Sequence, residues 1–218
     1  MVLPSILSAD FARLGEECEQ VLAMGADGLH VDVMDGHFVP NLTMGPAVVR
    51  SLRERLPEAW LDVHLMVEKP GALLEPFADA GADHLTVHAE VVPVSAREGM
   101  VDHIRSLGCT AGLALNPDRP IETDRGTFEL FDMILVMSVF PGFSGQAFIE
   151  DSVQRCAAAR DAVKPQTRVE MDGGIAPDTA DRVREAGCDA LVAGSAVFGV
   201  QDVDKKEVIE ILRGSGPA

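Results

Sequence analysis

The chain has 218 residues, of which 47% are hydrophobic and 24% charged, and its formal net charge is −17. This composition is typical of a globular protein with a sizeable core and argues against disorder, while the negative charge disfavours binding to nucleic acid or to an anionic membrane. No apolar run approaches the roughly 18 residues that a membrane-spanning helix needs.

Short apolar runs alternate with amphipathic segments along the chain. Residues 1–11 lack the basic region and cleavage site of a signal peptide, so we interpret them as part of the fold. Amphipathic segments such as FARLGEECEQVLAM and DSVQRCAAARDAV predict helices, and the weakest helix is expected in 116–131, which has two prolines near its start. The apolar runs predict eight strands, at Leu3–Leu7, Leu29–Val33, Leu61–Leu65, Leu85–His88, Ala111–Leu115, Met133–Met137, Arg168–Met171 and Ala190–Ala193.

Three similar segments occur along the chain: MGADGLHVD (24–32), AGADHLTVH (80–88) and AGCDALVAG (186–194). Each is typical of a helix that ends at a glycine and is followed by a turn and a buried strand. The spacing of their glycines approximates two and then four units of about 27 residues, which is one eighth of the chain. We therefore predict an α/β fold, a single (β/α)8 TIM barrel over residues 1–218, with an open doubly wound sheet as the alternative.

Titratable side chains collect where the predicted strands end, most densely in HVDVMDGHFVPN (30–41). His30 and Asp32 are two residues apart at the end of the second strand and therefore share a face. His64 closes the third strand and Asp172 the seventh. In a barrel the carboxyl ends of the strands surround one site, so these four side chains could converge on the axis.

Two imidazoles and two carboxylates make a plausible site for Zn²⁺, Fe²⁺, Mn²⁺ or Co²⁺. Taken singly, a histidine at a strand end is more often a structural hydrogen-bonding group, and an aspartate before Gly-Gly is more often a turn former. Four such groups at equivalent ends of three strands favour the metal site. Glu170 is a weaker candidate for a supporting contact, and His84 and His88 are weaker candidates for ligands.

Three glycine-rich turns follow the last three strands: PGFSGQ (141–146), DGGI (172–175) and GSAVFG (194–199). Barrels often hold a phosphate between the loops after strands 7 and 8, using backbone N–H groups. None of the three turns contains a lysine or an arginine. A phosphate bound there would therefore depend mainly on backbone donors.

Seven motifs, in order and across nearly the whole chain, resemble the ribulose-phosphate 3-epimerase family: SILSADFARL, HVDVMDGHFVPNLTMGP, DVHLMVEKP, GLALNP, PGFSGQAF, MDGGI and VAGSAVFG. The resemblance implies a barrel of the ribulose-phosphate-binding type and one divalent metal ion, with Zn foremost and Fe, Mn or Co as alternatives. It implies His30, Asp32, His64 and Asp172 as metal ligands, and Asp32 and Asp172 as the acid–base pair. The substrate contacts that it implies are Ser8, His64, Gly142, Phe143, Ser144, Gly145, Gly173, Gly174, Gly194 and Ser195.

The chain departs from the family pattern after the sixth strand, where SVFPGFSGQ replaces a motif like T-V-N/E-P-G-F-G-G-Q. Phe140 stands where a polar residue is usual, and Ser144 where a glycine is usual. If position 144 requires a positive φ, serine would cost on the order of 1 kcal/mol there. This departure bears on the choice of substrate more than on the type of reaction.

The resemblance predicts a metal-dependent epimerase that interconverts D-ribulose 5-phosphate and D-xylulose 5-phosphate. Removal of a proton next to a ketone gives an enediolate, and two carboxylates on opposite faces could take and return the proton. An epimerase acting on another ketose phosphate, such as allulose 6-phosphate, is the first alternative. A metal hydrolase and a sugar-phosphate-binding protein without catalysis are the others.

The four cysteines, Cys18, Cys109, Cys156 and Cys188, are far apart and form no CxxC pair. Their spacing argues against a disulfide framework or a structural zinc site and favours a reducing, cytoplasmic location. We expect a small-molecule sugar phosphate as the partner, no nucleic acid or membrane partner, and a homo-oligomer.

Overall fold

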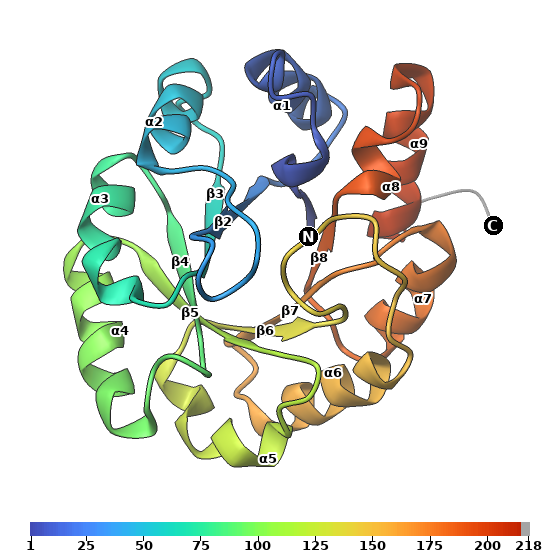
Figure 1. The fold of residues 1–218 in the computed structure, drawn as a ribbon. Helices are drawn as coiled ribbons and strands as arrows, with labels where there is room; N and C mark the ends of the chain where they lie inside the picture. Colours follow the sequence, from blue (N-terminus) through green and yellow to red (C-terminus); the bar gives the residue numbers. More distant parts are fainter. Residues whose placement is uncertain (215–218) are drawn as a thin grey trace.

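The computed structural model describes residues 1–214, so the end of the predicted domain, 215–218, lies outside the described residues. All eight predicted strands are present within it (Figure 1). Their bounds are β1 Val2–Pro4, β2 Leu29–Met34, β3 Leu61–Met66, β4 His84–His88, β5 Thr110–Leu115, β6 Met133–Met137, β7 Arg168–Asp172 and β8 Ala190–Ala193.

Helices surround these strands as an outer ring (Figure 1). The longer helices are α1 Leu14–Ala23, α2 Pro46–Arg55, α3 Leu74–Asp79, α4 Arg97–Ser106, α6 Asp151–Ala162, α7 Pro177–Glu185 and α9 Asp202–Arg213. The connection between β5 and β6 was predicted to hold the weakest helix, and it contains one turn, α5 (Ile121–Asp124), followed by a 3-10 segment. The second short helix, α8 (Ser195–Phe198), begins directly after β8. No helix among the described residues is long and apolar enough to cross a membrane.

The strands form one parallel sheet in the order β1-β8-β7-β6-β5-β4-β3-β2. Its two edges are joined by a parallel bridge between Ser5 and His30, so the sheet curls into a barrel. This closure confirms the (β/α)8 prediction and excludes the open doubly wound sheet. The first strand is shorter than predicted: instead of reaching Leu7, it stops at Pro4, because the backbone turns into a 3-10 segment, Ile6–Ser8, whose Leu7 N–H donates to the Ser5 hydroxyl.

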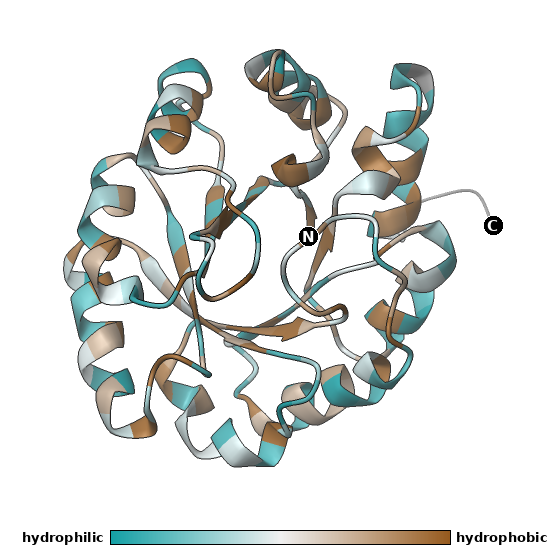
Figure 2. Cartoon of the chain, viewed as in Figure 1, coloured by the Kyte–Doolittle hydropathy of each residue, from teal (hydrophilic) through white to brown (hydrophobic). Residues whose placement is uncertain are grey.

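Side chains alternate between the two faces of each strand, so one set points into the barrel and the other points toward the helices. The outward residues of β2 and β3, such as Val31 and Val63, are apolar and pack in the layer between the barrel and the helices. The helices mix hydrophilic and hydrophobic positions, as helices with one buried face do (Figure 2). The inward residues of the same strands include His30 and His64, so polar groups occupy the barrel itself. The larger apolar core therefore lies between the barrel and the helices, while the inside of the barrel combines smaller apolar clusters with the polar groups.

Glycine makes room for that polar interior at one position of β5. A Cβ at Gly112 would lie 2.3 Å from the Thr86 hydroxyl oxygen and 2.5 Å from His84 Nε2. Any larger residue would collide with both side chains, which are fully or almost fully buried. The glycine of GLALNP therefore has a packing role inside the barrel.

The repeated segments have a structural cause at the amino-terminal end of the barrel. Asp27, Asp83, Asp132 and Asp189 come just before β2, β4, β6 and β8. Each carboxylate accepts the N–H of the first or second residue of the preceding strand, at 2.7–2.9 Å. Each also pairs with an arginine from a helix, in the order Arg213, Arg53, Arg105 and Arg160. Three of these four aspartates, Asp27, Asp83 and Asp189, lie in the repeated segments, so the repetition reflects their shared role in linking neighbouring strands.

Candidate metal and active site

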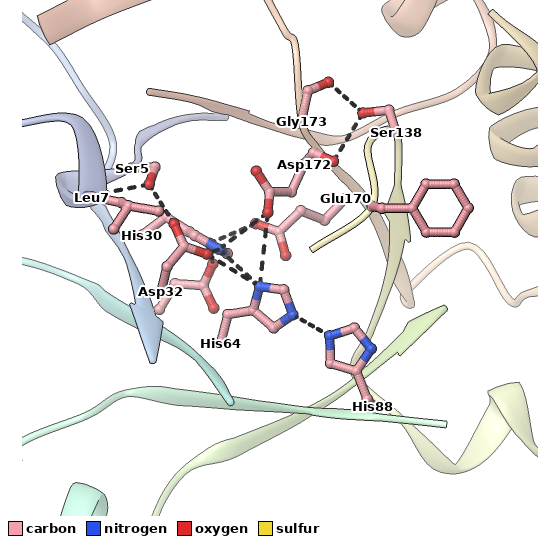
Figure 3. A network of polar contacts seen from close by, with 12 residues as sticks. Ser5, Leu7, His30, Asp32, His64, His88, Ser138, Glu170, Asp172 and Gly173 are labelled. Carbon is pink, nitrogen blue, oxygen red and sulfur yellow. Dashed lines mark hydrogen bonds and ion pairs between the residues drawn. The ribbon is translucent and has the colours of Figure 1, made fainter. Parts of the chain in front are cut away.

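Four side chains from three strands meet at the carboxyl end of the barrel (Figure 3). His30 Nε2 lies 3.3 Å from Asp32 Oδ1 and 3.3 Å from His64 Nδ1. Asp172 Oδ2 approaches the same two nitrogens at 3.9 and 3.8 Å. One donor atom from each residue therefore falls within a single group whose members are all within 4.8 Å of one another. The convergence expected from the sequence is present.

The chemistry of this group fits a divalent cation. Both imidazoles are fully buried, and the two carboxylate side chains are 5% and 15% exposed. Within residues 1–214 neither carboxylate has an ion pair with lysine or arginine, and their charged neighbours are the histidines themselves. Buried carboxylates need a counter-charge, and two nitrogen and two oxygen donors suit a transition metal or zinc. The donor set therefore favours a metal ion.

The two oxygens of Asp32 face different surroundings. Oδ1 points to the imidazoles, at 3.3 Å from His30 Nε2 and 3.4 Å from His64 Nδ1. Oδ2 accepts a short hydrogen bond from the Ser5 hydroxyl. One oxygen thus faces the imidazoles, while the other accepts a hydrogen bond. Ser5 holds the carboxylate in this orientation.

The surroundings of the two aspartates shift their pKa values in opposite directions. Burial acts to raise the pKa of Asp32, but the charge of His30 and hydrogen bonds from both histidines outweigh it and hold this pKa well below its usual value. Burial and the neighbouring charge of Asp32 raise the pKa of Asp172 to about 7. Without a cation, Asp32 is therefore ionised at neutral pH, while Asp172 is protonated only below about pH 7. A metal ion in contact with either group lowers its pKa.

A second carboxylate layer lies beneath His30. The Nδ1 atom of His30 is 2.6 Å from Asp62 Oδ2 and 3.7 Å from Glu170 Oε1. Asp62 and Glu170 are fully buried, and neither Glu170 oxygen has a hydrogen-bond partner among the described residues. A ligating histidine commonly donates its other N–H to a carboxylate, which fixes its tautomer. Asp62 occupies that position behind His30, with Glu170 next to it.

A cavity of about 390 Å³ opens above the four-residue group. Its lining includes both aspartates and Met34, Met66 and Met137, which supply apolar surface. All of the predicted substrate contacts except His64 line this cavity; His64 is fully buried below it. The Ser8 hydroxyl is buried and has no hydrogen-bond partner among the described residues, so it can donate to a ligand. The turn after β7 and the start of α8 also border the cavity.

The β6–α6 loop forms one wall of the cavity and is tied to the loop after β2. The Asn41 amide donates to the Gly142 carbonyl at 2.7 Å, and the Gln146 amide donates to the carbonyls of Phe140 and Phe143. Ser144 does not have a positive φ, so serine carries no left-handed strain at this position. The rings of Phe140 and Phe143 are 51% and 56% exposed. Serine therefore causes no backbone strain at position 144, and Phe140 adds an exposed aromatic ring to the loop.

Three residues that position the site were not identified from the sequence. Asp62 lies two residues before His64, so the two share an inward face, and the spacing argument applied to His30 and Asp32 would have found it. Ser5 was overlooked in favour of Ser8; both line the cavity, but only Ser5 contacts Asp32. Ser138 holds the end of β7, because its hydroxyl contacts the carbonyls of Asp172 and Gly173 at 2.9 and 2.6 Å (Figure 3). No sequence signal distinguishes that serine from an ordinary core residue.

Comparison with known proteins identifies the family of the chain. The model of the ribulose-phosphate 3 epimerase family matches residues 1–198. A protein of Bacillus subtilis (strain 168) named ribulose-phosphate 3-epimerase is 45% identical over 218 residues, which cover 98% of each chain. A chloroplastic ribulose-5-phosphate-3-epimerase of Arabidopsis thaliana is 47% identical over 93% of this chain and 73% of its own. The crystal structure of a 3-keto-L-gulonate-6-phosphate decarboxylase from Vibrio cholerae, 16% identical, has a TM-score of 0.76 over 99% of this chain and 96% of that one, and supports the fold alone.

Proposed function

The chain belongs to the ribulose-phosphate 3-epimerase family, and we propose that it interconverts D-ribulose 5-phosphate and D-xylulose 5-phosphate through proton transfer at carbon 3. The observation that carries this proposal is the convergence of Asp32 and Asp172 on one cavity beside two buried imidazoles. The hexulose alternative, such as allulose 6-phosphate, is not favoured, because the family model and the relatives carry the ribulose-phosphate name.

Different residues of the chain would bind the metal ion and transfer the protons. His30, Asp32, His64 and Asp172 would hold a divalent cation, which supplies a Lewis acid that stabilises the negative charge of an enediolate. Asp32 and Asp172 come from β2 and β7, so their carboxyls can flank a planar intermediate from two sides. One removes the proton while the other returns a proton to the opposite face, and the reverse reaction exchanges the roles.

The remaining contacts orient the substrate and keep water away. The turn at Gly173 and Gly174, with Gly194 and Ser195 at the start of α8, would receive the phosphate through backbone N–H groups. Ser8 and the β6–α6 loop, from Gly142 to Gly145 with Phe143 and Ser144, would contact the sugar phosphate from the other side of the cavity. Met34, Met66 and Met137 supply the apolar wall that limits proton exchange with solvent.

Incubation of metal-loaded protein with D-ribulose 5-phosphate in D2O tests the reaction. We expect D-xylulose 5-phosphate that carries deuterium at carbon 3, detected by proton NMR as loss of that signal. Product without label at carbon 3 would indicate hydrolysis or another reaction, and binding without turnover would support a sugar-phosphate-binding protein. A higher kcat/KM for allulose 6-phosphate than for ribulose 5-phosphate would reassign the substrate.

Zinc is our proposal for the metal, because zinc readily takes histidine nitrogens and carboxylate oxygens in one four-coordinate site. Chelation should abolish turnover, and Zn²⁺ should restore it at one equivalent per chain. Fe²⁺, Mn²⁺ and Co²⁺ suit the same donors and form the comparison series. Metal analysis of protein purified without added metal completes the test. Iron or manganese at full stoichiometry, with faster reactivation than zinc gives, would replace zinc in this proposal.

We also propose a cytoplasmic homo-oligomer that binds no nucleic acid. All four cysteines are free and buried, as suits a reducing compartment, and the charge of −17 disfavours nucleic acid. Light scattering that gives the mass of a single 23.2 kDa chain would contradict the oligomer.

A further inference from the structure

The two ring nitrogens of His64 serve different neighbours. Nδ1 belongs to the four-residue group with Asp32 and Asp172. Nε2 lies on the other side of the ring, 2.8 Å from Nε2 of His88, which closes β4 (Figure 3). A contact of this length between two imidazole nitrogens is a hydrogen bond, so one nitrogen carries the proton and the other accepts it.

The requirement for a free Nδ1 decides which nitrogen carries that proton. A histidine binds a metal through an unprotonated nitrogen, so His64 Nδ1 must have its lone pair available. The neutral His64 ring then carries its proton on Nε2 and donates it to His88. Consequently Nε2 of His88 is the acceptor, and a neutral His88 carries its own proton on Nδ1.

His88 Nδ1 faces a group that accepts this proton. It lies 3.1 Å from Oε2 of Glu90, and Oε1 of Glu90 accepts the backbone N–H of Asn116 at 3.1 Å. His88 is fully buried, with the nearly coplanar His64 ring end to end with it at a centroid distance of 4.9 Å and the Phe38 ring centroid 4.6 Å away on a tilted plane. Both ends of the chain Glu90–His88–His64 are therefore fixed by packing and by hydrogen bonds.

The reversed arrangement is unfavourable. If His88 donated to His64, the proton of His64 would move to Nδ1 and block ligation there. The Nδ1 of His88 would then present a lone pair to the Glu90 carboxylate at 3.1 Å, and two acceptors would face each other in a partly buried place. The carboxylate thus selects the tautomer of His64 through one intervening ring.

We propose that Glu90 and His88 are positioning residues that hold His64 in the tautomer whose Nδ1 can bind the metal. This inference rests on the proposed metal-dependent epimerase. Neither residue lines the cavity, so each acts through His64 and not on the substrate. The tautomer of His30 is fixed more directly, because Asp62 accepts a hydrogen bond from His30 Nδ1 at 2.6 Å. Each imidazole of the four-residue group then has a carboxylate acceptor, directly for His30 and through His88 for His64.

Metal affinity tests the proposal. Glu90→Leu removes the acceptor, and we expect Zn²⁺ to bind about 10- to 100-fold more weakly, as measured by competition with a chromophoric chelator. Glu90→Gln keeps an oxygen that can accept the same hydrogen bond, so it should recover most of the affinity. Glu122→Leu, the same exchange on the exposed face of α5, should bind Zn²⁺ like the wild type. Unchanged affinity in Glu90→Leu would overturn the proposal.

The ring protons provide a second readout that a purely structural role would not change. In metal-free wild-type protein, two-bond proton–nitrogen NMR spectra should show the proton on Nε2 of His64 and on Nδ1 of His88. Glu90→Leu should shift both rings toward a mixture of tautomers. If wild-type His64 instead carries its proton on Nδ1, the assigned hydrogen-bond chain is wrong.

These measurements separate the inference from the proposed function. Affinity and tautomer are measured without a substrate. A wild-type protein that fails to epimerise ribulose 5-phosphate, but loses Zn²⁺ affinity on Glu90→Leu, refutes the function and retains the positioning role of Glu90. An active epimerase whose Zn²⁺ affinity is the same in both proteins retains the function and refutes the positioning role.

Discussion

Asp172→Asn is expected to lower kcat for epimerisation by a factor of about 10²–10⁴, and Asp32→Asn by a similar factor. Asparagine has the shape of aspartate and keeps one oxygen for ligation, but it cannot take up or release the proton. Coupled assays that start from each epimer measure the loss. Asp161→Asn, the same exchange on the exposed side of α6, is the matched control and should have the wild-type kcat.

Isotope exchange makes this prediction sharper than a loss of activity. If each aspartate serves one face of carbon 3, the variant that lacks one of them can still remove a proton on the other face and return it there. We therefore expect each variant to exchange the carbon-3 hydrogen of one epimer with D2O without inversion, and the two variants to exchange opposite epimers. Metal content and unfolding midpoint must first match those of the wild type.

Two outcomes would contradict the assignment of one aspartate to each face. Near-normal epimerisation in either variant would remove that residue from the proton transfer. Exchange of the same epimer by both variants would mean that a single group serves both faces.

Local sequence patterns predicted the barrel and the convergence of the four-residue group because both depend on alternation. In β2 and β3 every second residue faces inward, so His30, Asp32 and His64 could be placed on the inner face from spacing alone. Asp172 followed from the equivalent position at the end of β7. The repeated segments indicated the number of strands, because each marks a helix end with a positive φ, such as Gly81 at 103°.

The sequence patterns did not predict the contacts between segments that are distant in the chain. The hydrogen bond between Ser5 and Asp32 and the contact between His64 and His88 depend on the stagger of neighbouring strands, which the sequence pattern does not express. The end of β1 was misplaced for a similar reason: the run from Leu3 to Leu7 is apolar enough for a strand, but the Ser5 hydroxyl caps a 3-10 turn. A tertiary interaction there overrides the local preference.

The largest effect on stability is expected at the buried pair Arg97–Asp124, which joins α4 to α5. Both side chains are fully buried, and the guanidinium donates to Asp124 Oδ1 at 2.6 Å, to Thr127 and to the Val92 carbonyl. Asp124→Asn leaves a buried positive charge without its counter-charge. We expect a loss of about 3–5 kcal/mol in the free energy of unfolding, measured by urea titration.

Two further variants identify the buried charge as the cause. Asp118→Asn makes the same chemical change at an exposed position on the same connection and should alter stability by less than about 0.5 kcal/mol. The double variant Arg97→Met with Asp124→Leu removes both charges and should lose less than the single variant Asp124→Asn, because apolar pairs can replace buried ion pairs. A double variant at least as unstable as Asp124→Asn would assign the effect to packing instead.

The pH dependence of stability follows from the direction of the Asp124 shift. Burial opposes ionisation, but hydrogen bonds from Arg119 and Arg97 outweigh it and lower the pKa of Asp124 in the folded protein. A group whose folded pKa is lowered stabilises the fold above its unfolded pKa of about 3.9, and this contribution is lost as the pH falls through the folded value. The difference between wild type and Asp124→Asn should therefore be largest near neutral pH and shrink below about pH 4. A difference that stays constant down to the acid transition would show that the ionised carboxylate is not what stabilises Arg97.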